Sequence, residues 1–309
     1  MLKKITLAAL TAGLCISHAM ASAEVRIGVS MSQFDDAWLT VLRQDLLKNA
    51  KASTDPITLQ FVDARADVNR QLDQVQDLVG KKVDAIIVNP VDTAATARIT
   101  QSATAAGIPL VYVNRRPDES NLPDGVATVT SDGVEAGRMQ MQYLAEKLGG
   151  KGDIVMLLGD LANNATHNQT KGVQETLKAY PGIKVLEQQT GTWQRQRGMD
   201  ITNDWITQGR QFNAVLAYND EMGIGAAMAL KQAGVAQGKV LVTGMDGTPD
   251  GLYAVKKGSL TVSLYQDANA QASEAINVAL RMIKKDPVAN REILIPYRLI
   301  TPENVDSFK

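Results

Sequence analysis

The feature that most constrains the fold is a regular alternation of short apolar runs with amphipathic helical segments. Runs such as DAIIV at 84–88 and GDIVMLL at 152–158 are almost wholly apolar, as in parallel strands that are covered on both faces. Amphipathic segments lie between such runs, for example at 37–54, 69–80 and 221–233. This alternation predicts a doubly wound α/β architecture. The expected strands are at 25–29, 57–62, 85–88, 110–113, 126–129, 154–158, 184–189, 214–217, 240–243 and 261–264.

The chain also resembles itself, which predicts two similar lobes rather than one continuous sheet. VDAIIVNP at 83–90 is echoed by FNAVLAYN at 212–219. In both halves a helix ends in Ala-Gly before a hydrophobic strand. Gly107 and Gly234 therefore fit the position just after a helix, where a left-handed backbone suits glycine. The joint at 130–132 has no linker character, so we expect a short, hinge-like connection.

The amino-terminal residues predict export. Two lysines precede an apolar run at 5–16, and the small residues at 21–23 are typical of a signal-peptidase cleavage site. The run is too short to span about 30 Å of hydrocarbon. A buried helix is the alternative, but Ala-x-Ala directly before Glu24 favours a cleaved leader. We therefore expect residues 1–23 to be a signal peptide.

Composition and missing motifs exclude several function classes. The one cysteine, Cys15, lies in the leader behind Leu14 rather than behind a small residue, so we expect neither a lipid anchor nor disulfides in the mature chain. Without the leader lysines, 30 basic and 33 acidic residues remain with no basic stripe, which argues against nucleic acid. Phosphate-binding glycine loops, a nucleophile elbow and calcium-loop motifs are absent from the sequence. We expect no cofactor, no metal and no catalytic residues.

Polar and aromatic residues follow the expected strands in both halves of the chain. Ligands of open parallel sheets bind outside the carboxyl ends of the strands. Carboxylates, amides and an arginine suit the hydroxyl groups of a neutral polyhydroxylated ring, and flat aromatic side chains cover its apolar face. The candidate ligand-binding residues are Asp36, Trp38, Asn89, Arg115, His167, Trp193, Asn219, Asp246 and Gln266.

Several of these residues have a purely structural alternative. Trp38 could belong to the core, and Asp246 could serve a turn before its glycine. Asp220, near a helix start, could be a helix cap. One arginine of the pair that follows the fourth strand is expected to be solvated. His167 either hydrogen-bonds the ligand or serves as a cap or surface residue, and no catalytic partner accompanies it.

Taken together, these segments resemble the pentose- and hexose-binding periplasmic proteins of the ribose- and galactose-binder type, over the whole mature chain. The similar segments are VSMSQFDDAWL (29–39), AIIVNPVD (85–92), VYVNRRP (111–117), AYNDEMGIGAAMAL (217–230), GMDGTPDG (244–251) and LYQDANAQASE (264–274). The resemblance implies a periplasmic sugar-binding component of an ATP-driven (ABC) importer. It also implies two lobes that close on the ligand about three crossings, near 130–132, 264–266 and 291–293.

One departure from that family bears on the ligand. His167 stands where ribose and galactose binders present an arginine, and with the NRRP turn it is more similar to inositol and rhizopine binders. We therefore expect a cyclic polyol such as myo-inositol, with a ribose- or galactose-type aldose as the alternative. The expected amino-terminal lobe is 24–130 plus 266–292, and the carboxyl-terminal lobe is 131–265 plus 293–309.

The resemblance also implies partners and separates this chain from two rivals. The expected partners are a membrane permease and, in a further role, a chemoreceptor; the protein itself is expected to be a monomer. Sugar-responsive transcriptional regulators share the fold, but they carry a DNA-binding segment where this chain has a leader. A glycosidase would need paired carboxyls about 5–10 Å apart and room for a leaving group, which a closed monosaccharide pocket lacks.

Overall fold

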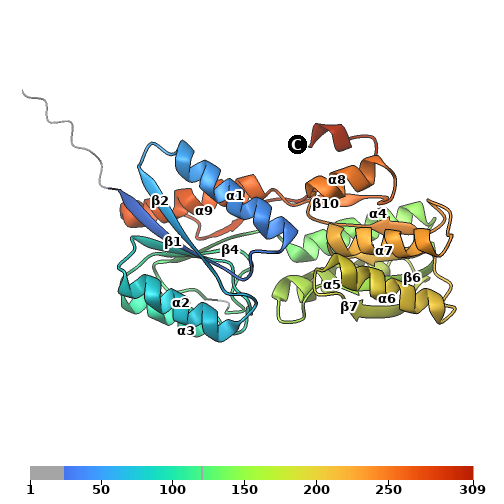
Figure 1. Ribbon diagram of the computed structural model, residues 1–309, viewed down its shortest axis with the longest axis horizontal. Coiled ribbons are helices and arrows are strands. Elements are labelled where there is room, and N and C mark those ends of the chain that lie inside the picture. Colours follow the sequence, from blue (N-terminus) through green and yellow to red (C-terminus); the bar gives the residue numbers. More distant parts are fainter. Residues whose placement is uncertain (1–23, 120, 309) are drawn as a thin grey trace, which may run out of the picture.

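The structure, a computed structural model, describes residues 24–119 and 121–308. The predicted signal peptide at 1–23 lies outside the described residues. The chain forms two α/β lobes side by side along the long axis of the molecule (Figure 1). The α/β class and the two-lobed organisation predicted from the strand–helix alternation are thereby confirmed.

The amino-terminal lobe is built on a parallel sheet of strand order β11-β5-β4-β3-β1-β2. Its strands are β1 (Val25–Met31), β2 (Ile57–Asp63), β3 (Ala85–Val88), β4 (Leu110–Asn114), β5 (Val126–Thr130) and β11 (Glu292–Leu294). Its helices are α1 (Ala37–Ala52), α2 (Val68–Gly80), α3 (Ala97–Ala105) and α9 (Ala268–Ile283). Helices α1 and α9 cover one face of the sheet, and α2 and α3 cover the other.

Strand β3 shows why an uninterrupted apolar run is needed here. Ala85 and Ile87 belong to the core beneath α1 and α9, whereas Ile86 and Val88 belong to the core beneath α2 and α3. All four residues are fully buried. Because successive side chains of a strand point to opposite faces, a sheet covered on both sides needs apolar residues at every position.

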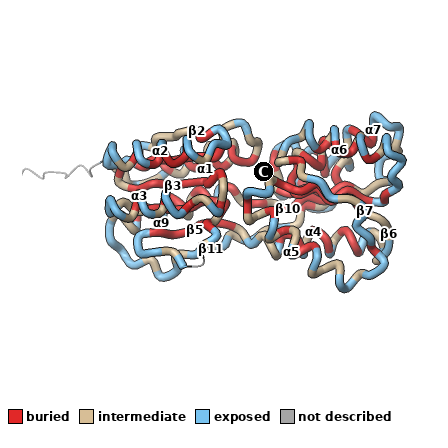
Figure 2. The backbone as a smooth tube through the Cα atoms, turned by 90° about the horizontal axis from the view of Figure 1, so that it is seen from below, coloured by how far each residue is buried: buried red, intermediate tan, exposed pale blue. Residues whose placement is uncertain are grey.

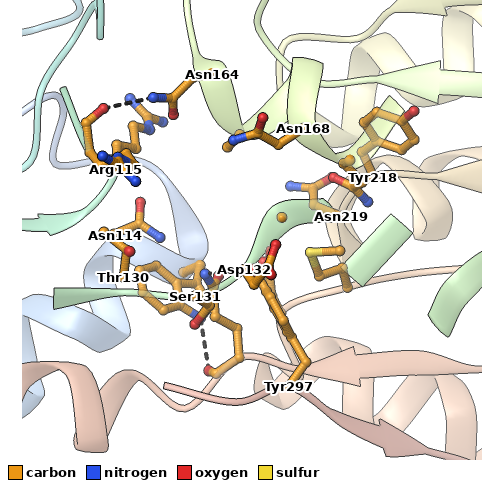
Figure 3. A pocket seen from close by; sticks show the side chains of 18 of the residues that line it. Asn114, Arg115, Thr130, Ser131, Asp132, Asn164, Asn168, Tyr218, Asn219 and Tyr297 are labelled. Atoms are coloured by element: carbon orange, nitrogen blue, oxygen red, sulfur yellow. Dashed lines mark hydrogen bonds between the residues drawn. The ribbon is translucent and has the colours of Figure 1, made fainter. Parts of the chain in front are cut away.

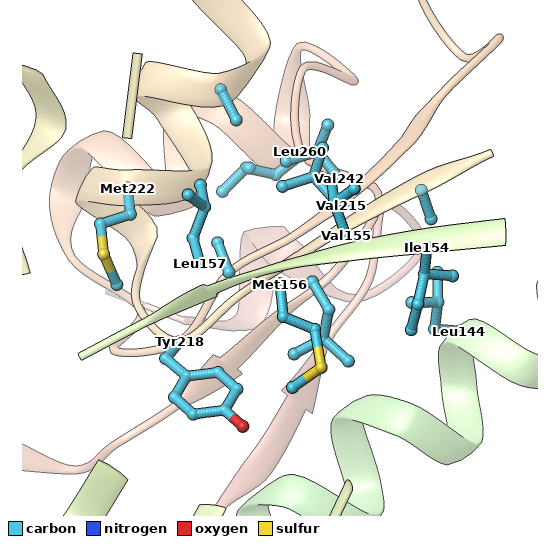
Figure 4. Close-up of a cluster of buried hydrophobic side chains, with 14 of the residues drawn as sticks. Leu144, Ile154, Val155, Met156, Leu157, Val215, Tyr218, Met222, Val242 and Leu260 are labelled. Atoms are coloured by element: carbon cyan, nitrogen blue, oxygen red, sulfur yellow. The ribbon is translucent and has the colours of Figure 1, made fainter. Parts of the chain in front are cut away.

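The carboxyl-terminal lobe contains a parallel sheet of order β7-β6-β8-β9 and a short antiparallel pair, β10 with β12. Its strands are β6 (Lys151–Leu158), β7 (Gly182–Thr190), β8 (Ala214–Ala217), β9 (Leu241–Thr243), β10 (Ser263–Tyr265) and β12 (Arg298–Ile300). Its helices are α4 (Gly133–Lys147), α5 (Asn164–Leu177), α6 (Arg195–Thr207), α7 (Asp220–Gln232), α8 (Pro249–Lys256) and the 3-10 turn η1 (Val305–Ser307). Its core gathers the apolar side chains of β6, β8 and β9 against the helices (Figure 4).

The two lobes share one topology, as the internal repeat predicts. The order β2-β1-β3-β4-β5 matches β7-β6-β8-β9, which continues to β10 through backbone bridges from Thr243 to Val262 and from Asp246 to Tyr265. Gly107 and Gly234 adopt positive φ angles of +68° and +74° after their helices, in agreement with the sequence. In this topology the strand order reverses beside the first strand of each lobe, and the crevice there is where ligands bind.

The chain passes between the lobes three times. The passages follow β5, β10 and β11, because β5 and β11 pair in the first sheet while β10 and β12 pair in the second lobe. The third passage corrects the expected crossing at 291–293. Leu294 still pairs with Thr130 in the first sheet, so the chain leaves that lobe only at 295–297.

Burial follows this layered design (Figure 2). The central strands form the buried interior of each lobe, and the helices expose their outer faces. None of the described helices combines the length and the apolar character needed to cross a membrane.

Candidate ligand-binding site

A cavity of about 310 Å³ lies between the two lobes, lined by residues from both. Ligand pockets typically measure about 300–1,000 Å³, so this one suits a small ligand. Figure 3 shows Asn114 and Arg115 reaching the cavity from the amino-terminal lobe and Asn168 and Asn219 from the carboxyl-terminal lobe. Seven of the nine residues expected from the sequence line it, namely Asp36, Trp38, Arg115, Trp193, Asn219, Asp246 and Gln266.

On the amino-terminal side, the loop after β1 supplies an acid and an indole. The Asp36 carboxylate caps α1 by accepting from the Leu39 amide at 2.8 Å. Trp38 is only 5% exposed, and its indole N–H donates to the Gln266 carbonyl at 3.2 Å. Trp38 therefore packs in the amino-terminal core, lines the cavity and donates to the passage that follows β10.

Arg115 is the buried cation of the site. Its side chain is 9% exposed, and Nη1 donates to the Pro90 carbonyl at 2.9 Å. Burial lowers the pKa of Arg115, while the charges of Asp36 and Asp160 oppose that change. Burial also raises the pKa of Asp36, against the opposing effects of its Leu39 hydrogen bond and of Arg115. Each group thus helps to keep the other charged.

On the carboxyl-terminal side, two residues that line the cavity, Trp193 and Asp246, have a positive φ angle. Trp193 has φ +67° and Asp246 has φ +117°. Such conformations are costly for residues other than glycine and gather at functional sites. Asn219 holds the backbone of Trp193 in place. Its Nδ2 donates to the Trp193 carbonyl at 3.0 Å, and its Oδ1 accepts from the Met222 amide at 2.9 Å.

Asp246 is the acid whose surroundings disfavour its charge most clearly. Burial raises the pKa of Asp246 well above its usual range, and the charges of Asp220, Asp36 and Glu221 raise it further. Among the described residues, none donates a hydrogen bond to the Asp246 carboxylate that would lower this pKa. A ligand hydroxyl that donates to Asp246 would provide the missing partner.

Asn89 does not reach the cavity, which corrects the sequence prediction. Its side chain is fully buried and its polar atoms are engaged within the lobe. The Asn89 Oδ1 accepts from the Ser32 hydroxyl at 2.7 Å, and Nδ2 donates to the Asn114 Oδ1 at 3.1 Å. Asn89 thus fixes the side chain of Asn114, which does line the cavity.

His167 does not line the cavity either, and its neighbour does. The His167 side chain is exposed, and its Nε2 lies 2.9 Å from the Leu161 carbonyl. Residues Asn164 and Asn168 of α5 line the cavity. Ala165 and Gln169 line it as well, and at about 100° per residue the centre of this four-residue face lies about 130° around the helix from His167. The structure thus places His167 at the surface, where its alternative role as a surface residue would put it.

The remaining lining residues were not singled out from the sequence. They come from the helix α5 face, from the passages between the lobes and from the ends of β4 and β8. Asn164 and Asn168 have a spacing of four at a helix start, a signal that could have identified them. The main additions are Asn114, Arg116, Thr130, Ser131, Asp132, Asn164, Asn168, Gln169, Tyr218, Met245 and Tyr297.

The assembled side chains suit a small molecule that both donates and accepts hydrogen bonds. Carboxylates of both lobes accept, the Arg115 guanidinium donates, and the amides of Asn114 and Asn168 do both. In the part of the chain that the structure describes, no group of three or more His, Cys, Asp or Glu side chains is arranged to hold a metal ion.

Comparisons with known proteins agree with this architecture. Residues 27–287 match the family model of the periplasmic binding protein domain. A Rhizobium meliloti protein to which rhizopine binding is ascribed is 42% identical over 92% of each chain. The xylitol-binding protein of Mycolicibacterium smegmatis is 37% identical over 91% of this chain and 78% of its own length.

A solved structure resembles the whole fold. The ABC transporter solute-binding protein of Bacillus halodurans, with bound myo-inositol, has a TM-score of 0.86 at 35% identity and covers 94% of this chain and 98% of its own. The predicted resemblance to sugar-binding periplasmic proteins is confirmed by these matches. The chain belongs to the periplasmic binding protein family.

Proposed function

We propose that this protein is the substrate-binding component of an ABC importer and that it captures a neutral cyclic polyol, with myo-inositol as the first candidate. The relatives support a polyol as the class of ligand, because rhizopine binding is ascribed to one, a second is a xylitol-binding protein, and the solved neighbour holds myo-inositol. The proposal involves binding and release without a covalent step. Secretion to the periplasm through cleavage of residues 1–23 and delivery to a membrane permease belong to the same proposal.

The observation that carries the proposal is a small cavity lined by two partly buried acids, Asp36 and Asp246, and by the buried Arg115 guanidinium. Asp36 and Asp246 can each accept from ring hydroxyls, and Arg115 can donate to them. The indoles of Trp38 and Trp193 line the same cavity and can cover the apolar face of a ring. A molecule without these hydroxyls would leave buried charged groups unpaired, at a cost of about 1–3 kcal/mol or more for each.

Two amides of α5 favour a cyclic polyol over an aldose. His167, from which the sequence predicts that preference, does not line the cavity, whereas the side chains of Asn164 and Asn168 do. Neutral amides on α5 suit a ligand that carries hydroxyls all around the ring, and the myo-inositol in the solved neighbour supports the same choice.

We further propose that the two lobes move as domains about the three passages. Direct bonds between the lobes lie beside the cavity and would close it. The Thr93 amide donates to the Ala162 carbonyl at 3.2 Å, and the Asn164 amide donates to the Thr93 hydroxyl at 3.0 Å. The Asn164 Nδ2 donates to the Arg116 carbonyl at 2.8 Å. Opening the lobes would break these bonds and release the ligand.

Thermal unfolding of the mature protein with a ligand panel tests the proposal. At 100 times its dissociation constant a ligand stabilises a protein by about 2.7 kcal/mol, and each kcal/mol raises Tm by about 2–4 °C at this size. We expect myo-inositol to raise Tm by roughly 5–10 °C, with smaller shifts for xylitol, ribose, galactose and glucose. A larger Tm shift with an aldose than with myo-inositol would identify the ligand as a sugar. No Tm shift with any of these compounds would refute the ligand class.

A pair of adjacent variants tests the assignment of the α5 face. Asn168→Ala removes an amide that lines the cavity, so myo-inositol should bind about tenfold more weakly, the effect of one lost hydrogen bond of about 1.4 kcal/mol. His167→Ala, one residue away and exposed, should leave the dissociation constant within about twofold. Titration calorimetry measures both. If His167→Ala weakened binding more than Asn168→Ala, His167 and not Asn168 would be assigned to the ligand.

A further inference from the structure

Asp220 is a buried carboxylate that does not line the cavity. It follows Asn219 at the start of α7, and its side chain is fully buried. The Oδ2 atom accepts from the Thr248 amide at 2.9 Å and from the Thr248 hydroxyl at 3.2 Å, and Oδ1 accepts from the Ser263 hydroxyl at 2.5 Å. The expected role as a helix cap belongs to Asn219 instead, which accepts from the Met222 amide.

The partners of Asp220 lie in the chain segments that carry cavity residues. Thr248 is two residues beyond Asp246, and Ser263 is three residues before Gln266. The backbone joins the same segments, because the Asp220 amide donates to the Met245 carbonyl at 2.6 Å and the Gln266 amide donates to the Asp246 carbonyl at 3.1 Å. One carboxylate therefore links the start of α7, the loop before α8 and strand β10.

The surroundings of Asp220 are shaped to admit its carboxylate. A Cβ atom on Gly251 would collide with Oδ2, and one on Gly244 would collide with Oδ1. Burial raises the pKa of Asp220, and the hydrogen bonds from Ser263 and Thr248 oppose that rise. A buried charge is a poor source of stability compared with apolar packing, so its value here is in fixing the position of these segments.

We propose that Asp220 is a positioning residue that holds Asp246 and Gln266 in the orientation that binds the ligand. The proposal rests on the proposed function, since affinity for a polyol is its main readout. Without the carboxylate, the loop that keeps Asp246 at φ +117° loses its anchor at Thr248. The side chain of Asp246 would then sample other directions, and binding would bear the cost of ordering it.

The first test is Asp220→Asn, which keeps the size of the side chain but replaces one carboxylate oxygen by an NH₂ group. That group would face the N–H or O–H of Thr248 or Ser263, which also donate. We expect myo-inositol to bind at least about tenfold more weakly, or about 1.4 kcal/mol, with cooperative unfolding retained. Amide NMR signals of residues 245–247 and of Gln266 should shift in the ligand-free protein. A folded Asp220→Asn variant with unchanged affinity and unmoved signals would overturn the proposal.

A second set of variants covers the case in which Asp220→Asn does not fold. Thr248→Val removes the hydroxyl that donates to Asp220, and Thr248→Ser keeps it. Thr202→Val is the matched control, because Thr202 is another buried threonine of this lobe whose hydroxyl donates to the Gly198 carbonyl, away from the cavity. We expect roughly tenfold weaker binding for Thr248→Val alone. Equal affinities for Thr248→Val and Thr202→Val would refute the positioning role.

The ligand-free NMR signals separate this proposal from the proposed function. If wild-type protein fails to bind myo-inositol or any other polyol or sugar, the proposed function fails. The amide signals of 245–247 still report whether Asp220 and Thr248 hold the loop. If the wild type binds and these signals move only in Asp220→Asn and Thr248→Val, both proposals stand.

Discussion

An Asp246→Asn variant is expected to lose most of its affinity for myo-inositol and yet to unfold at a higher temperature than the wild type at neutral pH. Replacing a charged acceptor by a neutral one costs about 1.5–3 kcal/mol of binding free energy, or roughly 10- to 150-fold in the dissociation constant. Asparagine is the right replacement, because Asn tolerates the positive φ of this position better than Ala. Titration calorimetry with myo-inositol gives the affinity.

The expected gain in stability follows from the direction of the pKa shift. The pKa of Asp246 is raised by burial and by the charges of Asp220, Asp36 and Glu221, so the folded state holds the proton more tightly than the unfolded chain does. Stability therefore falls as pH rises from the ordinary carboxyl range through the raised pKa. Asparagine carries no charge, so the variant should escape this loss at neutral pH.

Urea unfolding of ligand-free protein between pH 5 and pH 8 checks this sign. The wild type should lose stability with rising pH more steeply than Asp246→Asn. Asp204→Asn, an exposed position on α6, is the control and should follow the wild type. An Asp246→Asn variant that is less stable than the wild type at pH 7, or that binds myo-inositol equally well, would contradict the assigned role.

Arg115→Ala is expected to cause the second large loss of affinity. The guanidinium is buried, and in the described structure it makes one hydrogen bond to the protein, to the Pro90 carbonyl. Most of its five N–H donors thus remain for a ligand. Removing it also takes away the positive charge that lowers the pKa of Asp36. We expect about a 100-fold or greater loss, from a cost of about 3 kcal/mol or more.

Two further variants make the Arg115 experiment specific. Arg115→Lys keeps the charge but not the planar fork, so it should recover only part of the affinity. Arg116→Ala removes the adjacent, more exposed arginine, which pairs with Glu292 at 3.5 Å. Arg116 also lines the cavity, but it is partly exposed and pairs with Glu292, so the loss of affinity should be smaller than for Arg115→Ala. A greater loss in Arg116→Ala than in Arg115→Ala would reverse the roles of the two arginines.

The sequence predicted the central strands well because they are buried on both faces. Strand β3, for example, is a recognisable apolar run that divides its residues between two cores. Strands β11 and β12 were missed because each has three residues and is partly exposed. Without a periodic pattern, nothing local distinguishes them from loops, and the position of the third passage was misjudged as a result.

The candidate site was predictable where a residue directly follows a strand, and less so elsewhere. His167 and Asn168 are adjacent, and only the rotational phase of α5 decides which of them faces the cavity. Asn89 does follow a strand, but its amide is engaged by Ser32 and Asn114, from other strand ends. Such pairings depend on tertiary contacts and leave no mark in the local sequence.

The three passages between the lobes also determine how the ligand preference of this protein could be redesigned. Ser131, Gln266 and Tyr297 lie in or beside successive passages, and all three line the cavity. The Gln266 Nε2 donates to the Tyr297 hydroxyl at 3.1 Å. A substitution at these positions would alter ligand contacts and the stiffness of the connection together. A biosensor with a new specificity should therefore be built from positions that belong to one lobe, such as Asn168, where selectivity can change while the opening rate stays the same.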